Sequence, residues 1–243
     1  MQVRKNDLAE EVIQTNNILL PGGSNQLEYL LEQDILKGGQ ALIIGSNCES
    51  IATKLLEYFT SLYIVADNYD SVMQIRMKLK DEDKIKVKMM DYAHTDFQDK
   101  SFDLIFAQAS ISVPERKDIV KEIKRILTIN GLLCAGEIVS LKEPVPGFVN
   151  DIWERSGLEP IASSEIKKYY EGKGFGVLSE RDFSTTLRDF YEGTISVVSK
   201  TGKAEKEEDK KYFSRMKHES NAYLKLGGDK YIGFKSLIMR KLD

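Results

Sequence analysis

Between Gln40 and Val139 the chain alternates short apolar runs with stretches whose apolar residues recur at helical spacing, such as Ile51, Leu55 and Phe59. The short runs have the length and the branched residues of buried strands, and they cover 40–44, 61–66, 85–89, 102–107 and 132–139. Strands that alternate with helices build a parallel sheet covered on both faces. This pattern predicts an α/β fold with a doubly wound, mostly parallel sheet.

Less regular segments flank this core. On the N-terminal side, a helix is predicted over Asp7–Leu20 and ends at the Pro21-Gly22-Gly23 break, and a second helix runs from Ser24 or Asn25 to Ile35. On the C-terminal side, helices are predicted over 149–153 and 163–170, and strands begin at 175 and 231. Nine of the twelve residues of Lys200–Lys211 are charged, which indicates an exposed helix start or a loop.

Composition excludes several classes of protein. Lys and Arg number 35 against 38 Asp and Glu, and this near balance gives no basic surface for nucleic acid. Two cysteines and two histidines leave no zinc-ligand cluster, so we expect no metal site. No apolar run approaches the ~20 residues that span a bilayer, and acidic residues stand where a signal peptide needs an apolar core. We therefore expect a cytoplasmic protein that binds neither nucleic acid nor membrane.

Ligands of an open parallel sheet bind at the carboxyl ends of its strands. The first predicted strand ends in Ile43-Ile44-Gly45-Ser46-Asn47-Cys48-Glu49. A dinucleotide site needs the pattern G-x-G-x-x-G, of which only the first glycine is present, and no P-loop lysine follows. The loop therefore argues against a nicotinamide-dependent oxidoreductase and against a P-loop protein.

Acids follow the next two strands. Asp67 stands 22 residues after Gly45, where a carboxylate can accept two hydrogen bonds from a ribose diol. Asp91 and Tyr92 follow the third strand and suit the amino group and the ring face of an adenine. A single acid at a strand end is often only a solvated cap. The alignment of these acids at consecutive strand exits is what indicates a ligand site. Together they indicate an adenosine-containing ligand.

These segments, in this order, resemble the class I S-adenosylmethionine-dependent methyltransferases that modify small molecules. The matching segments are QALIIGSNCES, IVADNYDS, MMDYAHTDF, DKSFDLIFAQASI and KEIKRILTINGLLCAGE, and the final YIGFKSLIMRK suits the family's antiparallel last strand. The resemblance implies a seven-stranded Rossmann-like sheet and S-adenosylmethionine as the cofactor. It implies cofactor contacts from Gly45, Ser46, Asn47, Glu49, Asp67, Asn68, Asp91, Tyr92 and Gln108. It also implies one domain over 1–243, with N-terminal cap helices in 1–39, a cofactor-binding core in 40–140, and an acceptor-side insertion and final strand in 141–243.

The first motif departs from the family pattern in three places. Ile43 replaces the acid that meets the methionine ammonium in the family, and Asn47 and Glu49 replace two glycines. Asn47 tolerates a positive φ and can keep the turn. Glu49 adds a negative charge that could serve as the ammonium partner or repel the methionine carboxylate, and the sequence leaves both possibilities open.

Methyl transfer requires alignment of the acceptor, and it requires a base only if the acceptor must lose a proton. His94 is a candidate for that base, with a surface loop as its other interpretation, and His218 is expected to face solvent. Cys48 begins a predicted helix and is expected to be a buried, unreactive thiol.

The sequence thus predicts a methyltransferase that acts on an unidentified small-molecule acceptor. The alternatives are a catalytically inactive binding or scaffolding protein of the same fold, motivated by Ile43 and Glu49, and a nucleotide-binding oxidoreductase. The oligomeric state is left open.

Overall fold

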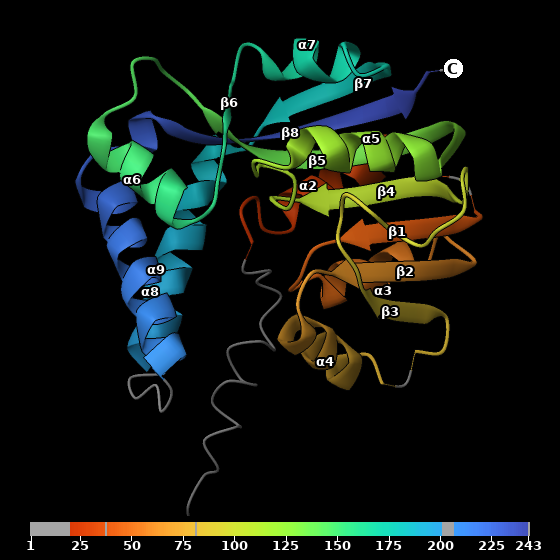
Figure 1. The fold of residues 1–243 in the computed structure, drawn as a ribbon, viewed down its shortest axis with the longest axis horizontal. Coiled ribbons are helices and arrows are strands. Elements are labelled where there is room, and N and C mark those ends of the chain that lie inside the picture. Colours follow the sequence, from red (N-terminus) through yellow and green to blue (C-terminus); the bar gives the residue numbers. More distant parts are fainter. Residues whose placement is uncertain (1–19, 37, 81, 201–206, 243) are drawn as a thin grey trace, which may run out of the picture.

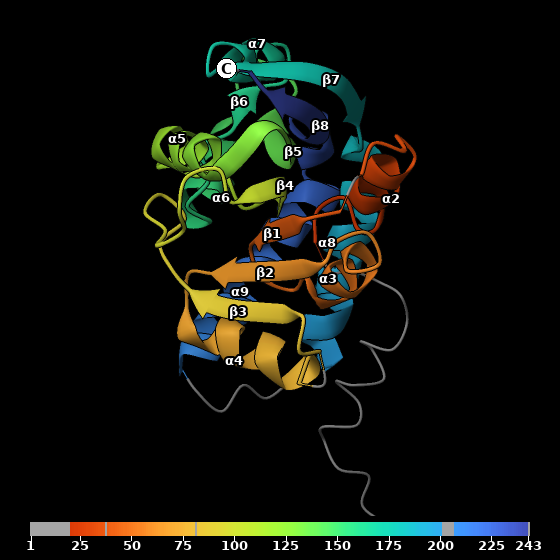
Figure 2. The ribbon, with the colours of Figure 1, turned by 90° about the vertical axis from the view of Figure 1, so that its right-hand side faces the viewer.

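A single twisted sheet forms the centre of the protein. The computed structural model describes residues 20–36, 38–80, 82–200 and 207–242 (Figure 1). Seen along the sheet, α2 and α3 lie on one side and α5 on the other (Figure 2). Within the described ranges, no helix combines the length and the apolar character needed to cross a membrane.

The strands of the sheet follow the order β3-β2-β1-β4-β5-β8-β7. Their bounds are β1 Gln40–Ile44, β2 Ser61–Ala66, β3 Ile85–Met89, β4 Phe102–Gln108, β5 Leu127–Ser140, β7 Phe175–Asp182 and β8 Ile232–Lys241. Strands β1 to β5 pair in parallel, whereas β8 pairs antiparallel with both β5 and β7. The predicted sheet, mostly parallel with an antiparallel last strand, is therefore confirmed. A two-residue strand that was not predicted, β6 (Ile161–Ala162), pairs with the end of β5.

The helices occupy three places around this sheet. Their bounds are α2 Asn25–Leu31, α3 Glu49–Leu55, α4 Tyr69–Lys78, α5 Arg116–Ile126, α6 Gly147–Arg155, α7 Ile166–Glu171, α8 Leu187–Lys200 and α9 Glu207–Lys225. Helices α5 and α7 pack on one face, and α2, α3 and α4 contribute to the core of the other. The arrowheads of β1 to β4 point toward the part of the molecule formed by α6, α8 and α9 (Figure 1).

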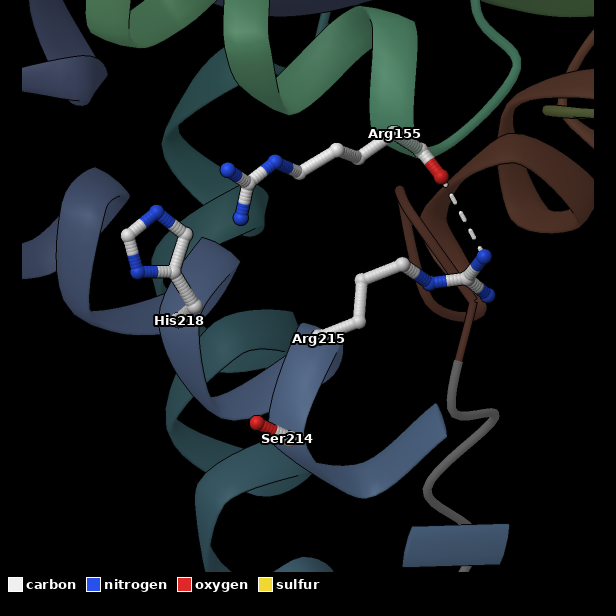
Figure 3. A pocket seen from close by; sticks show the side chains of 4 residues that line it. All are labelled: Arg155, Ser214, Arg215 and His218. Carbon is white, nitrogen blue, oxygen red and sulfur yellow. Dashed lines mark hydrogen bonds between the residues drawn. The ribbon is translucent and has the colours of Figure 1, made fainter. Parts of the chain in front are cut away.

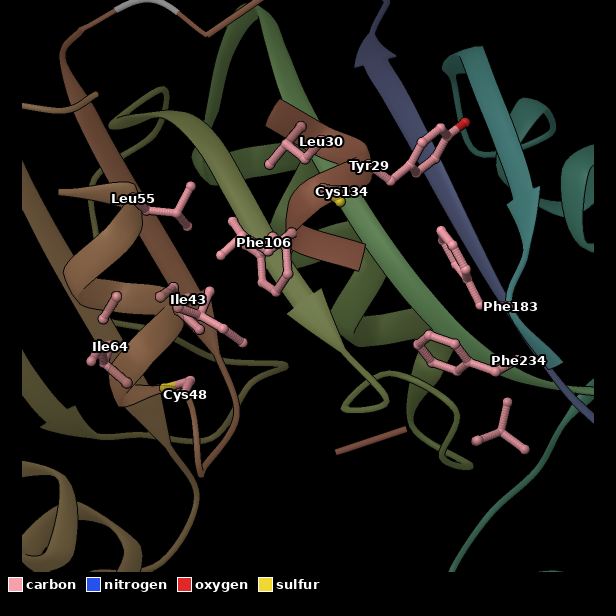
Figure 4. Close-up of a cluster of buried hydrophobic side chains, with 14 of the residues drawn as sticks. Tyr29, Leu30, Ile43, Cys48, Leu55, Ile64, Phe106, Cys134, Phe183 and Phe234 are labelled. Carbon is pink, nitrogen blue, oxygen red and sulfur yellow. The ribbon is translucent and has the colours of Figure 1, made fainter. Parts of the chain in front are cut away.

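The core consists of two apolar layers, one on each face of the sheet. Along β1, Ile43 points into the layer with α2 and α3, whereas Leu42 and Ile44 point into the layer with α5 and α7. Figure 4 shows the first layer, in which Ile43 and Phe106 pack beneath helical side chains. Burial on both faces explains why the parallel strands read as continuous apolar runs in the sequence.

Several predicted boundaries need correction. Helix α2 ends at Leu31 rather than at Ile35, because the backbone turns into the left-handed region at Asp34, with a φ of 51°. Strand β5 begins at Leu127 rather than at Leu132, since the Asn130-Gly131 pair lies inside the strand as an irregularity. There Leu127 pairs with Phe102 and Leu132 pairs with Leu104, so the ladder resumes after the extra residues.

Two expectations fall wholly or partly on segments that the structure leaves undescribed. The helix predicted over Asp7–Leu20 lies outside the described residues, except for its last residue. Of the charged stretch Lys200–Lys211, residue 200 ends α8 and residues 207–211 begin α9, while 201–206 lie outside the described ranges.

Candidate functional site

The carboxyl ends of four strands lie side by side at one edge of the sheet. Ile44, the last residue of β1, pairs with Val65 of β2 and with Ala107 of β4. Ala66 of β2 pairs with Met89, the last residue of β3. The loops that begin at Gly45, Asp67, Met90 and Ala109 therefore leave the sheet at nearly the same level. This edge holds the residues that the sequence pattern indicates as ligand contacts.

The loop after β1 makes a sharp turn at Gly45. Its φ of 132° is strained for any residue with a side chain, and its N–H donates to the Val65 oxygen at 3.0 Å. Ser110, two residues past the end of β4, donates from Oγ to the Ile44 oxygen at 2.8 Å. The turn is thus fixed from both neighbouring strands.

Asn47 adopts the left-handed conformation expected of it, with a φ of 55°. The next residue, Cys48, stands at the N-cap position of α3, makes no side-chain capping hydrogen bond and is buried at 2% exposure. Burial, with a smaller effect from Glu49, raises the pKa of the Cys48 thiol to about 12. Cys48 is therefore a packing residue rather than a nucleophile at physiological pH.

Glu49 opens α3, and its carboxylate has a protein partner. The Lys78 ammonium of α4 lies 3.0 Å from its Oε1, and the Glu49 side chain is only 14% exposed. The extra acid in the first loop is thereby compensated by a cation. This pairing weakens the case for repulsion of a bound carboxylate by Glu49.

Asp67 stands exposed at the end of β2, and Asn68 holds it in place. The Asn68 amide donates to Asp67 Oδ1 at 2.9 Å, while Asn68 Oδ1 accepts the Ser71 N–H at 2.9 Å as the N-cap of α4. Asn68 thus caps helix α4 and also orients the Asp67 carboxylate. Asp67 Oδ2 has no hydrogen-bond partner among the described residues, which leaves it able to accept a ligand hydroxyl.

Asp91 and Tyr92 follow β3 and have different surroundings. Asp91 accepts the Ala93 N–H at 2.8 Å and lies 3.2 Å from His94 Nδ1, and these two contacts, with the backbone bond the larger, lower the pKa of Asp91. Burial, followed by the nearby Asp67 carboxylate, raises the pKa of Tyr92. The structure therefore brings Tyr92 and Asp67 together from two strand exits.

His94 is not buried in a pocket. Its side chain is 80% exposed and pairs with Asp91. The surface-loop interpretation thus describes the structure better than the interpretation as a base that faces a bound ligand.

Gln108, the last residue of β4, is 6% exposed and anchors the N-terminal turn. Its Nε2 donates to the backbone oxygens of Pro21 at 2.7 Å and Gly23 at 2.8 Å. Its Oε1 is buried without a partner among the described residues. The amide therefore binds the Pro-Gly-Gly turn in this structure, and only its oxygen remains for a ligand.

Two further polar residues at this edge are not among the predicted site residues. Gln26 of α2 is fully buried and donates to the Ala107 oxygen at 3.0 Å, and Ser110 braces the first loop as described above. A polar residue inside an otherwise apolar helix stripe was the available signal for Gln26. Nothing in the sequence indicated the contact of Ser110 with a strand 66 residues away.

The second histidine, His218, lies on helix α9, beyond the carboxyl edge of the sheet. Arg155 of α6 and Ser214, Arg215 and His218 of α9 line a cavity of about 420 Å³, and Arg215 Nη1 donates to the Arg155 oxygen at 3.2 Å (Figure 3). His218 is exposed, as predicted. The cavity carries cationic groups, which suit anionic molecules.

The carboxyl edge of the sheet has side chains that suit the adenosine part of a ligand. An oriented acid, an aromatic ring and a tight glycine turn converge there. The methionine end is less complete, because Ile43 is buried at 1% exposure in the core and no acid replaces it on β1.

Residues 42–135 match the family described as "Methyltransferase domain". A search of curated proteins finds no significant match. Solved structures share the fold over nearly the whole chain. The [4+2]-cyclase SpnF superposes with a TM-score of 0.77 at 18% identity, covering 98% of this chain and 93% of that one.

Two methyltransferases show the same likeness. Phosphoethanolamine N-methyltransferase 2 of Haemonchus contortus, solved with phosphomonomethylethanolamine and S-adenosylhomocysteine, has a TM-score of 0.76 at 15% identity and covers 96% of this chain and 56% of that one. Geranyl diphosphate C-methyltransferase of Streptomyces coelicolor A3(2) has a TM-score of 0.67 at 11% identity, with coverages of 90% and 77%. At these identities the likeness shows a shared fold.

Proposed function

Residues 42–135 form a methyltransferase domain of the class I, S-adenosylmethionine-dependent type, and from this premise we propose that the protein methylates a small-molecule acceptor. The observation that carries the proposal is the convergence of Gly45, Asp67 and Tyr92 at one sheet edge. Asp67 would accept the ribose hydroxyls, and Asp91 and Tyr92 would meet the adenine. Gly45, Ser46 and Asn47 would follow the methionine part of the cofactor.

When bound, the cofactor supplies a methyl group on a sulfonium, so the leaving group needs no activation by the protein. The chain's own task is to position the acceptor and exclude water. Helices α6, α8 and α9 stand beyond the carboxyl edge and would form the acceptor side (Figure 1). We assign no base, since His94 pairs with Asp91 and faces solvent.

The domain boundaries and the cellular setting belong to the same proposal. In this proposal 1–243 is one domain, with an N-terminal cap in 1–39, a cofactor core in 40–140 and an acceptor side in 141–243. A cytoplasmic protein that acts on a free small molecule, without nucleic acid or membrane, fits the near balance of charges. The substrates for which the two similar methyltransferases are named, a phosphorylated ethanolamine and geranyl diphosphate, support a small acceptor.

Binding calorimetry tests the proposal. S-adenosylmethionine and S-adenosylhomocysteine should each give a saturable heat with a Kd below about 1 mM, whereas NAD should give none. A panel of small amines, carboxylic acids and phosphorylated alcohols, mixed with methyl-labelled cofactor, then identifies the acceptor class. The absence of heat from both cofactor forms at millimolar concentration would contradict the proposal.

A second candidate is a protein that keeps the fold without methyl transfer. Ile43 in place of an acid favours it, and so does the likeness to SpnF, which is named for a cyclase reaction. Cofactor binding with no transfer to any acceptor of the panel would support this alternative. Transfer to one acceptor would exclude it.

A further inference from the structure

Arg116 at the start of α5 is an unusual residue for its position. The residue is 6% exposed, and it occupies the first turn of a helix, where the helix dipole disfavours a cation. Its Nη2 donates to the Glu159 backbone oxygen at 2.6 Å and lies 3.4 Å from Glu137 Oε2. A buried guanidinium in this place requires nearby acceptors, and Glu137 supplies the opposite charge.

Glu137 of β5 is completely buried and is satisfied within the protein. Ser112 donates to its Oε2, and Tyr170 donates to its Oε1. Together with Arg116, these donors form a closed network around the carboxylate. The Tyr170 hydroxyl therefore has a structural role.

Two donors beside this network have no acceptor in the part of the chain that the structure describes. Arg116 Nε and the hydroxyl of Tyr169 are both buried, and neither has a hydrogen-bond partner among the described residues. Burial raises the pKa of Tyr169, so its hydroxyl keeps its proton. Unpartnered buried donors are uncommon, and each costs stability until an acceptor reaches it.

Both residues line one cavity of about 530 Å³. It lies between the start of α5, the segment 159–161 and α7, on the sheet face opposite α2 and α3. The guanidinium carbon of Arg116 is 5.9 Å from the ring centroid of Tyr169, and Lys173 Nζ is 5.2 Å from the same centroid. The rim holds Lys168 paired with Glu165 at 3.9 Å, and both side chains are exposed.

We propose that this cavity is a binding site for a small oxyanion, a carboxylate or a phosphate group. The two unpartnered buried atoms are both donors on residues that line the cavity. A guanidinium and a phenol hydroxyl can each donate to the oxygens of such a group. Lys173 adds a cation at the rim. The acids at the rim are exposed, so solvent and salt screen them more than they screen the buried Arg116.

The tyrosine pair offers a matched test. Thermal unfolding is measured at constant ionic strength while chloride is replaced by inorganic phosphate or by acetate, for the wild type, Tyr169→Phe and Tyr170→Phe. At about ten times the Kd, the effective anion should raise the wild-type Tm by ~3–5 °C. The anion with the larger shift identifies the chemistry.

The variants separate binding from structure. Tyr169→Phe removes a hydroxyl that has no partner among the described residues, so without anion the variant should unfold at the wild-type temperature or above. It should also lose most of the anion-induced shift in Tm. Tyr170→Phe should unfold at a lower temperature and keep the shift. Lys173→Gln removes the cation at the rim of the cavity and should weaken anion binding several-fold.

No anion shift in the wild type at about 100 mM would overturn the proposal. An equal shift in the wild type and in Tyr169→Phe would also overturn it, because the anion would then bind elsewhere. Neither result bears on the cofactor site, which lies at the carboxyl edge of the sheet.

Discussion

Glu49 and Lys78 form an ion pair that joins the two helices following β1 and β2, with 3.0 Å between Oε1 and Nζ. The acid is 14% exposed and the ammonium 37% exposed, so the pair is partly shielded from solvent. It places a compensated charge beside the loop that we assign to the cofactor.

The pair should stabilise the fold measurably. Glu49→Gln and Lys78→Gln should each lower the free energy of unfolding by about 0.5–1 kcal/mol, and the double variant should lose little more than either single variant. Urea denaturation measures this coupling. The exposed pair Lys54–Glu57, 2.8 Å apart, is the matched control and should show weaker coupling. Fully additive losses at Glu49 and Lys78 would contradict the interpretation.

The same substitution tests the role of Glu49 in binding. Because Lys78 engages the carboxylate, Glu49→Gln should leave the Kd for S-adenosylmethionine within about threefold of the wild type. Calorimetry on both proteins gives the comparison. A loss of about tenfold or more would show that Glu49 has replaced the missing acid at position 43 as the ammonium partner.

Gln108→Leu should loosen the N-terminal turn. It removes two hydrogen bonds to the backbone oxygens of Pro21 and Gly23, so the free energy of unfolding should fall by about 1–2 kcal/mol. Amide hydrogen exchange should increase around residues 20–31. The exposed Gln74→Leu is the control, and equal exchange in the two variants would argue against the anchor.

Glu219 of α9 should make stability depend on pH. Burial raises the pKa of its carboxyl, which accepts hydrogen bonds from Ser156 and Tyr191 and has Arg215 and His218 nearby. A folded-state pKa above the unfolded value means that this stabilisation is complete below about pH 4.5 and is lost as pH rises through the folded pKa.

Glu219→Gln cannot ionise. Its stability relative to the wild type should therefore increase between about pH 4 and pH 8. Denaturation at several pH values measures this difference, and the exposed Glu192→Gln provides the baseline. A relative stability that stays constant or falls with pH would contradict the assigned direction.

Both cysteines should resist alkylation in the folded protein. Burial raises the pKa values of Cys48 and Cys134 to about 12 each, so almost no thiolate exists near neutral pH. Iodoacetamide should modify both only after unfolding. Rapid modification of native Cys48 would show that the loop after β1 opens readily.

The sequence predicted the strands of the core closely because each is buried on both faces and is therefore a continuous apolar run. It also predicted that Gly45, Asp67 and Tyr92 would share one edge, since parallel strands end together. The extension of β5 to Leu127 was missed because Asn130-Gly131 reads as a turn, although the ladder tolerates it as an irregularity.

The partners of the site residues could not be predicted in the same way. Glu49 meets Lys78 because α3 and α4 cover the same face of the sheet, and Gln108 meets Pro21 across 87 residues. Contacts of this kind depend on tertiary packing, and no local pattern encodes them. The buried Arg116–Glu137 pair joins a helix start to the interior of a strand for the same reason.

The central claim is that S-adenosylmethionine binds at the carboxyl edge with its ribose on Asp67. Calorimetric titration of S-adenosylhomocysteine into the wild type, Asp67→Ala and the nearby control Asp70→Ala tests it most directly. Loss of a hydrogen-bonded carboxylate should weaken binding by roughly 10–150-fold in Asp67→Ala, while Asp70→Ala stays within about threefold. Equal affinity in all three proteins, or no binding to the wild type, would contradict the account.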